Sequence, residues 1–444
     1  MIKKLKEKKY QILELIIIFI ITLLFNLVCN QFNLDELWNY GFSYNISKGL
    51  IPYKDFNMII TPFFPILGAL FLIIFGKNLL VFHIFNSLVC TTIFYYMKKF
   101  IPKYYYMIYA ILLSYSFPNY NIFCILLLYI LMNMENKKTN DYLIGIVLGL
   151  TFITKQNIGI YLCIPTLFIK DIKKMFKRGI GFIIPVLLLI VYLLINNCLY
   201  EFIDYAFLGV SSFAEKNKIL STTNIIIVSL TTIYLIYQYI KHKDINIIYL
   251  LSFQLLVFPL LETYHLMIAL IPILGHISNK VKIPINKKLI IAAFFTFILI
   301  IFTGNIIKIN HGEYELPNDT NVYKYRRLNR YEDVAIKDVI KYMKSYEGKL
   351  YIISKSAYTF KLEGDMKINK YDLLNNGNLG SGGHQKIIKE IEEYCNNNKC
   401  VFFVDEKELE NEEEGVYNVE IVKFVTETYK RNTKINGLTI YTNY

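Results

Sequence analysis

The chain has 444 residues, of which 55% are hydrophobic, and its mean hydropathy of +0.37 excludes an ordinary soluble protein. The formal net charge is +13, but residues 1–307 hold 27 basic and 13 acidic residues, whereas residues 308–444 hold 21 and 22. Because the positive excess lies wholly in the apolar part, it indicates membrane orientation and argues against nucleic-acid binding.

Apolar runs along residues 1–307 predict a polytopic α-helical membrane domain with about eleven spans, since one span needs ~20 mostly apolar residues. Six runs have that length: 11–29, 79–97, 179–197, 222–240, 244–261 and 289–307. Five shorter runs complete the set: 104–118, 121–133, 141–154, 157–169 and 264–278. The run 62–76 contains Pro62 and Pro65, and we expect it to lie in the interface or to dip in and out of the membrane.

The charges between the runs predict the orientation. With a cytoplasmic N-terminus and each run crossing in turn, the inner loops hold 21 lysines and arginines and the outer loops hold six. This bias places residues 308–444 outside the cytoplasmic membrane. The first run lacks a small-x-small cleavage site after it, so we expect it to remain as a membrane helix.

Residues 308–444 predict a small extracytoplasmic α/β domain. The segments "YEDVAIKDVIKYMKSY" (331–346) and "GGHQKIIKEIEEYC" (382–395) have helical spacing, whereas 349–354, 400–406 and 437–444 resemble strands. This domain either docks on and shields the membrane domain or carries chemistry of its own. Its acidic run, 405–415, favours a solvated loop.

The cysteines predict packing and one candidate disulfide. Five of the seven lie in or at the edge of apolar runs, where core packing is expected. Cys395 and Cys400 lie in the predicted outer domain, between a helix end and a strand start, and a disulfide between them is one of two alternatives. Metal-ligand spacings such as CxxC and HExxH are absent from the sequence.

The stretch "CNQFNLDELWNYGFSYNISKGLIPYKDF" (29–56), directly after the first run, places Asp35 beside Glu36. Adjacent carboxylates at a membrane edge are costly and indicate a functional site. One of them could instead cap a helix. A carboxylate here could act as a general base or bind a divalent cation that holds a phosphate. Asp55, in "PYKDF" with Tyr53, is either functional or part of a proline-initiated turn.

Lys155 lies in the predicted outer loop "TKQN" beside Gln156, against the charge bias. A lysine at a span end usually extends its amine to the interface, but here it could also bind a phosphate.

Two further outer loops offer polar candidates. Glu262 and His265 in "LETYH" either bind substrate or form a hydrogen-bonded packing pair. Asn119 and Asn121 in "PNYN" either contact substrate or simply end a helix.

The stretch "LDELWNYGFSYNISKGLIPYKDFNMIITPFFPILGALFLIIFGKNLLVFHIFN" resembles the first outer loop of the GT-C membrane glycosyltransferases. It is most similar to the branch with protein O-mannosyltransferases, aminoarabinose–lipid A transferases and glycosyltransferase-family-39-like proteins. The shared pattern is Asp-Glu, a helix, Gly-x-x-Pro-Tyr-x-Asp, Thr-Pro and an apolar helix ending in Phe-Gly. The segments "GIVLGLTFITKQNIGIYL" (145–162) and "PLLETYHLMIALIP" (259–272) resemble later family segments, so the similarity covers roughly residues 10–307.

This resemblance implies a transferase that moves a sugar from a polyprenyl-phosphate donor to an outer-surface acceptor (a glycan, lipid or protein). A base on one face of the sugar and a leaving phosphate on the other predict a single displacement that inverts the anomeric centre. By position, Asp35 matches the family's catalytic aspartate, Asp55 a second acidic residue and Lys155 a lysine near the donor phosphate. Several relatives carry another acidic residue where this chain has Asn119 and Asn121, which favours direct base catalysis over a divalent cation.

The sequence leaves two other functions open. A transporter or flippase of lipid-linked sugars predicts charges at mid-membrane and paired broken helices, neither of which is visible in the sequence. A polysaccharide polymerase or ligase predicts an arginine-rich outer loop, but the longest outer loop, 196–221, holds lysines and no arginine.

Overall fold

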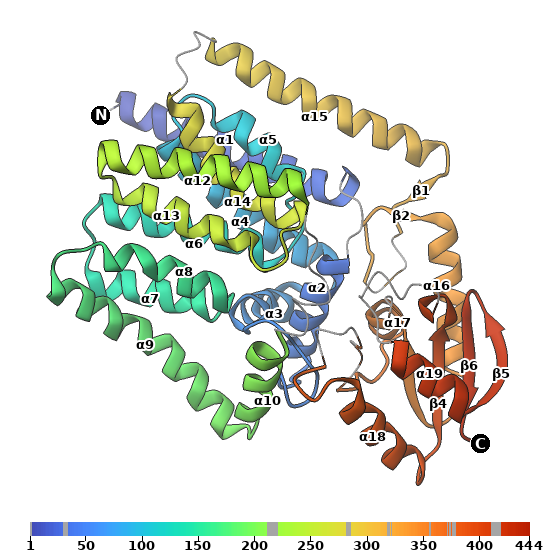
Figure 1. Cartoon of the computed structure of the whole chain (residues 1–444). Helices are drawn as coiled ribbons and strands as arrows, with labels where there is room; N and C mark the ends of the chain where they lie inside the picture. The colour runs from blue at the N-terminus through green and yellow to red at the C-terminus, as the bar shows by residue number, and fades with distance from the viewer. Residues whose placement is uncertain are drawn as a thin grey trace.

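A computed structural model describes residues 2–29, 34–210, 221–280, 286–317, 320, 322–354, 357–370, 372, 374, 379–409 and 419–444. The described chain up to residue 310 is mainly helical (Figure 1). Its elements are α1 (Ile2–Leu24), the π-helix η1 (Phe25–Cys29), α2 (Leu34–Ser47), α3 (Phe63–Phe75), α4 (Leu79–Phe100), α5 (Tyr105–Leu113), α6 (Tyr120–Asn136), α7 (Asp141–Phe152), α8 (Gln156–Leu167), α9 (Ile172–Ile195), α10 (Leu199–Ile203), η2 (Asp204–Leu208), α12 (Thr222–His242), α13 (Ile245–Gln254), η3 (Leu255–Val257), α14 (Thr263–Lys280) and α15 (Lys287–Asn310).

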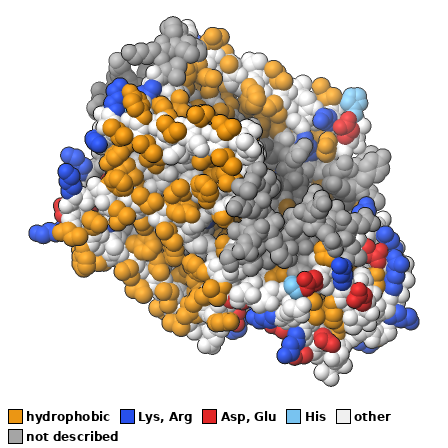
Figure 2. Space-filling view, in the orientation of Figure 1, with side chains coloured by type: hydrophobic (Ala, Val, Ile, Leu, Met, Phe, Trp, Pro, Cys, Tyr) orange, Lys and Arg blue, Asp and Glu red, His pale blue; other side chains and the backbone are white. Residues whose placement is uncertain are grey.

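Five helices in the described part of the chain are long and apolar enough to cross a membrane: Lys8–Cys29, α4, α9, α12 and α15. The chain is therefore a multi-pass membrane protein. Each of the eleven predicted runs contains a helix, but several of these helices are short, so the span count stays a prediction. Figure 2 shows hydrophobic side chains spread over the helical face of the molecule, with charged side chains over the C-terminal part and along the opposite edge of that face.

The run 244–261 forms a shorter helix than predicted. Helix α13 ends at Gln254 and is followed by the 3₁₀ turn η3. Phe258 is extended, with φ −89° and ψ 145°, because the ring of Pro259 disfavours a helical conformation in the residue before it. This early end leaves residues 258–262 as a turn that leads into α14.

Helix α3 corresponds to the run 62–76 that was expected not to cross. It has 13 residues and rises about 20 Å, which is less than the ~30 Å hydrocarbon layer. It begins after Pro62 and ends at Gly76, whose φ of 117° is easily reached only by glycine. Helix α3 packs against α2 and α4, so it supports the first loop.

Close helix packing joins α7 to α9. A Cβ atom on Gly145 would lie 2.2 Å from the Arg178 carbonyl oxygen, and one on Gly149 would lie 2.4 Å from that of Phe182. The spacing Gly145–x–x–x–Gly149 thus lets the two backbones touch, as small residues do between membrane helices.

The C-terminal part (residues 312–444) contains a mixed sheet with helices around it. Its elements are β1 (Tyr314–Glu315), β2 (Leu328–Asn329), α16 (Arg330–Met343), β3 (Lys349–Ile353), α17 (Ala357–Glu363), α18 (Gly383–Cys395), β4 (Cys400–Asp405), η5 (Glu406–Leu409), α19 (Val419–Thr428), β5 (Lys430–Ile435) and β6 (Leu438–Thr442). The sheet order is β3-β4-β6-β5, with β3 and β4 parallel and the other pairs antiparallel.

The predicted helices and strands of this part are confirmed, and Cys395 and Cys400 form a disulfide. Strand β5 was not predicted because "KRNTKI" is an edge strand of mostly exposed polar residues without apolar alternation. Helices α17 and α19 were also not predicted. The predicted acidic loop 405–415 begins in β4 and η5, and its residues 410–415 lie outside the described residues.

The C-terminal part docks on the first loop beside α2 (Figure 1). Tyr358 of α17 packs its ring edge against Phe42, with 6.2 Å between ring centroids. It also fills the space above Gly41, where any Cβ would lie 2.4 Å from the ring. The backbone N–H of Asn57 donates to the backbone carbonyl of Lys370 over 2.9 Å. These contacts agree with the predicted docking role.

Candidate functional site

Four helices begin close together and carry most of the predicted site residues. Asp35 lies in the first turn of α2, Lys155 is the N-cap of α8, and Glu262 directly precedes α14. Asn121 lies in the first turn of α6. Because helix N-termini carry a partial positive charge, their convergence favours an anion. We call Asp35, Asn121, Lys155, Glu262 and His265 the acid–lysine cluster.

Lys155 lies at the centre of this cluster. Its Nζ donates to Asn121 Oδ1 over 2.8 Å and lies 5.2 Å from the centroid of the Tyr120 ring. Burial lowers the pKa of Lys155 to about 8, although the negative charges of Glu262 and Asp35 act in the opposite direction. The lysine is therefore close to both carboxylates while part of its surface stays exposed.

The pKa of Asp35 is also shifted toward neutral pH. Burial raises the pKa of Asp35 to about 6; the charge of Glu262 adds to this shift, and Lys155 opposes it. Its side chain is only partly buried. A carboxylate that is deep enough to titrate near neutral pH, yet accessible, is suited to accept a proton.

Glu262 and His265 form a pair at the start of α14. Their Oε1 and Nδ1 atoms are 2.6 Å apart. Burial would raise the pKa of Glu262, but the hydrogen bond and charge of His265 and the charge of Lys155 lower it. The ring of Tyr264 stacks on Phe117 at 5.3 Å, which holds α14 against the segment before α6.

Asn119 serves the helix rather than the cluster. Its Oδ1 accepts from the backbone N–H groups of Asn121 and Ile122 over 2.8 and 3.1 Å. Its Nδ2 donates to the Phe117 carbonyl. Asn119 thus caps the start of α6, whereas the sequence had suggested a helix end. The cap positions Asn121, whose side chain does reach Lys155.

The structure separates Glu36 from Asp35. Its Oε2 and Oε1 accept from Arg326 Nη2 and Nε over 3.1 and 3.2 Å, and His83 Nε2 lies 2.6 Å from Oε1. All three side chains are buried. Although burial raises the pKa of Glu36, Arg326 and His83 outweigh it and hold that pKa at about 2. In place of the predicted catalytic role, we assign Glu36 a structural one.

Three further predicted residues make contacts away from Lys155. The hydroxyl of the fully buried Tyr53 donates to the Ile60 carbonyl over 2.7 Å, and Asp55 Oδ2 accepts from the Ile51 amide over 2.7 Å. Gln156 Nε2 donates to the Ala206 carbonyl over 2.6 Å. These bonds shape the first loop and fasten α8 to η2.

A metal site does not fit the described residues. They hold no cluster of three or more His, Cys, Asp or Glu side chains that could bind a metal ion. Asp35 and Glu262 are close to each other, but Lys155 supplies the positive charge beside both. We therefore derive no step through a cation.

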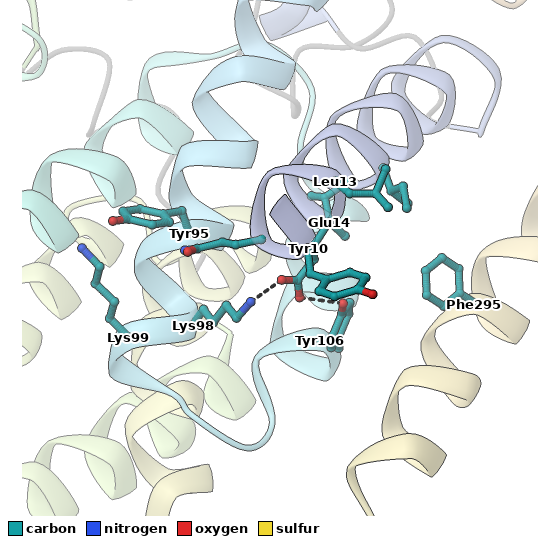
Figure 3. A pocket seen from close by; sticks show the side chains of 11 residues that line it. Tyr10, Leu13, Glu14, Tyr95, Lys98, Lys99, Tyr106 and Phe295 are labelled. Atoms are coloured by element: carbon teal, nitrogen blue, oxygen red, sulfur yellow. Dashed lines mark hydrogen bonds and ion pairs between the residues drawn. The ribbon is translucent and has the colours of Figure 1, made fainter. Parts of the chain in front are cut away.

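A cavity of about 660 Å³ lies far from the cluster, between α1, α4, α5 and α15 (Figure 3). There Glu14 pairs with Lys98 and accepts from the Tyr106 hydroxyl over 2.8 Å. Glu14 precedes the end of η1 by about four turns, so this cavity is roughly 20 Å along the helix from the first loop.

No family model and no curated protein matches the chain. Among solved structures, the chain is similar to ArnT from Cupriavidus metallidurans bound to undecaprenyl phosphate, at 9% identity with a TM-score of 0.60 over 98% of each chain. It is equally similar to apo ArnT, over 99% of this chain and 98% of ArnT. ArnT is a GT-C superfamily member, so the resemblance found in the first loop is confirmed at the level of the fold.

Proposed function

We propose that this protein is a membrane glycosyltransferase that moves a sugar from a polyprenyl-phosphate donor to an acceptor hydroxyl. One observation carries the proposal: an accessible carboxylate, Asp35, and a lysine, Lys155, interact where four helix N-termini meet. The GT-C fold shared with ArnT, whose structure holds undecaprenyl phosphate, supports a lipid-phosphate donor.

The position of the cluster suits such a donor. A polyprenyl tail stays in the lipid, so its phosphate can be reached only near the membrane surface. Asp35 follows the end of the first spanning helix, Lys8–Cys29. Lys155 offers a charge-assisted hydrogen bond to a phosphate oxygen, and the N-termini of α6, α8 and α14 add partial positive charge.

The reaction is a single displacement at the anomeric carbon. The hydroxyl oxygen of the acceptor bonds to the anomeric carbon, and Asp35 accepts the proton that this hydroxyl loses. The bond from that carbon to the phosphate oxygen breaks on the opposite face, and the electron pair stays with the polyprenyl phosphate, next to Lys155. The product has an inverted anomeric centre.

We place this chemistry on the outer face of the cytoplasmic membrane. The loop charge bias supports a cytoplasmic N-terminus and an extracytoplasmic domain comprising residues 308–444. The Cys395–Cys400 disulfide supports the same orientation, because disulfides persist in oxidising compartments.

The test compares purified wild type with Asp35→Asn on polyprenyl-phosphate sugars, with cell-envelope extract as acceptor. We expect the wild type to consume a donor and the variant to lose at least ~100-fold in rate, as after loss of a general base. Asp171→Asn, which changes an exposed helix cap, is the matched control and should keep its rate.

Folding is checked in the same preparations. Asp35 has a raised pKa in the folded protein, so its ionisation above about pH 6 disfavours the fold. Asp35→Asn should therefore unfold at the same or a higher temperature at pH 7. Equal donor consumption by the variant and the wild type would overturn the proposed function.

A further inference from the structure

A second cavity, of about 880 Å³, lies between the first loop and the C-terminal part. Leu50 and Asp55 come from the loop that follows α2. The other walls come from the end of α16 and the turn after it, from β3, from residues 364–370, and from the end of α18 with the turn that leads into β4. Two acidic residues line it, Asp55 and Asp365. Six lysines line it: Lys54, Lys344, Lys349, Lys367, Lys370 and Lys399.

The two acidic residues are already engaged in other contacts. Asp365 Oδ1 lies 3.3 Å from Lys48 Nζ and accepts from the Tyr44 hydroxyl over 3.1 Å. Asp55 accepts from the Ile51 amide. Glu347, outside the cavity wall, pairs with Lys399 over 2.9 Å. The wall therefore keeps an excess of positive charge.

Lys349 shows that lysines crowd here. Its Nζ lies 4.1 Å from the centroid of the Tyr394 ring and 5.1 Å from that of Tyr351. Burial lowers the pKa of Lys349; the positive charges of Lys361 and Lys367 lower it further, whereas the negative charges of Asp372 and Glu390 raise it. Lys361 is itself paired with Asp372 over 2.9 Å. Lys349 and Lys367, which both line the cavity, are therefore the positive charges of this group that an anion in the cavity would meet.

The distance to Asp35 indicates the size of the anion. Helix α2 has 14 residues, about 21 Å in length, and separates Asp35 in its first turn from Leu50 on the cavity wall. A small acceptor in the cavity would be too far from Asp35 to react. An extended chain could lie in the cavity and still present its end to Asp35.

We propose that this cavity binds a phosphodiester polymer, and that such a polymer is the acceptor of the glycosyl transfer. The acceptor role rests on the proposed function, whereas the binding of the polymer does not. Lysine ammonium groups bind phosphates as point charges, and the volume falls in the usual range for ligand sites. Tyr346 and Tyr394 add amphipathic rings to the wall for the uncharged units of the chain.

The test is fluorescence anisotropy of the detergent-solubilised full chain with a fluorescein-labelled glycerol phosphate hexamer. Lys349→Gln/Lys367→Gln should bind the hexamer at least ~10-fold more weakly than wild type. The matched control, Lys389→Gln/Lys434→Gln, removes the same charge from exposed positions of the C-terminal part and should bind like wild type. Lys349→Arg/Lys367→Arg should restore binding and shows that the fold tolerates substitution there.

Two comparison probes sharpen the result. Labelled maltohexaose lacks charge, and labelled hexaglutamate carries carboxylates in place of phosphates; both should bind more weakly than the hexamer. Equal loss in the control variant, or equal affinity for maltohexaose or hexaglutamate, would overturn the proposal.

The test is independent of catalysis. Asp35→Asn should bind the glycerol phosphate hexamer like wild type, because Asp35 is remote from the cavity. If no preparation turned over a donor, the proposed transferase function would be contradicted, but the polymer-binding site would not. Wild type that turns over donor but does not bind the hexamer would overturn the site alone.

Discussion

Asp35 and Lys155 have pKa values that burial moves toward each other, to about 6 and about 8. Each charged form is penalised by desolvation, and each residue partly compensates the other. Both pKa values are therefore close to neutral pH, so small changes in pH alter the charge of Asp35 and of Lys155. This pairing gives the cluster a defined pH window.

We predict a bell-shaped pH profile of kcat/KM with limbs near pH 6 and pH 8. Asp35 must be ionised to accept a proton, so activity falls as pH drops below about 6. Lys155 must be protonated to hold phosphate, so activity falls as pH rises above about 8. Lys155→Arg should lose the alkaline limb, because arginine stays charged. A profile that is flat from pH 5 to pH 9 would contradict these roles.

The residues of the cluster could be selected from the sequence because ionisable groups at the ends of apolar runs are unusual. Lys155 was also one of the few basic residues in the predicted outer loops. The fate of Glu36 could not be predicted, because its partner Arg326 is 290 residues away. Asn119 could not be distinguished from Asn121, since only the start of α6 shows which of them is the cap.

Helix α2 links the cluster to the C-terminal part. Its first turn carries Asp35 and also Glu36, which is bound by Arg326. Its middle packs Gly41 against Tyr358, and Lys48, just beyond its end, pairs with Asp365. A shift of the C-terminal part would therefore move α2 and, with it, Asp35.

Arg326→Met should destabilise the protein by about 3–5 kcal/mol, because it leaves the Glu36 carboxylate buried without its cation. Replacing both residues, as Glu36→Gln/Arg326→Met, should recover part of the loss. Lys48→Met breaks an exposed pair and should cost at most ~1 kcal/mol. Denaturant unfolding in detergent measures all three. Equal effects of Arg326→Met and Lys48→Met would show that the buried pair does not hold α2.

The helices were predictable at the element scale because hydropathy and length determine them. Strand β5 was not, because its polar edge residues lack the alternation that marks a half-buried strand. The early end of α13 depends on Pro259, whose effect on Phe258 was readable in the sequence but was outweighed by the apolar run.

The apolar face of the whole molecule ends where its charged residues gather. In Figure 2, Lys and Arg side chains border the helical face at the end that carries the N-terminus. The C-terminal part lies at another edge of that face, beside α2 and α10. Loop charges alone suggested this arrangement, but the contact between α2 and α17 depends on surface shape that composition does not encode.

Cysteine labelling tests the orientation. In intact cells, a membrane-impermeant maleimide should label Lys389→Cys, in α18, and should label Lys177→Cys, in α9, only after permeabilisation; both positions are exposed. The parent protein sets the background from its native cysteines. The reverse pattern would place the acid–lysine cluster on the cytoplasmic face.

Binding of undecaprenyl phosphate to Lys155→Met tests the central claim most directly, because it asks whether the cluster holds the donor's phosphate. Loss of one charge-assisted hydrogen bond should raise the Kd at least ~10-fold relative to wild type. Lys48→Met, an equal loss of charge next to α2, should leave the Kd unchanged. An unaltered Kd in Lys155→Met would contradict the assignment of this cluster as the donor site.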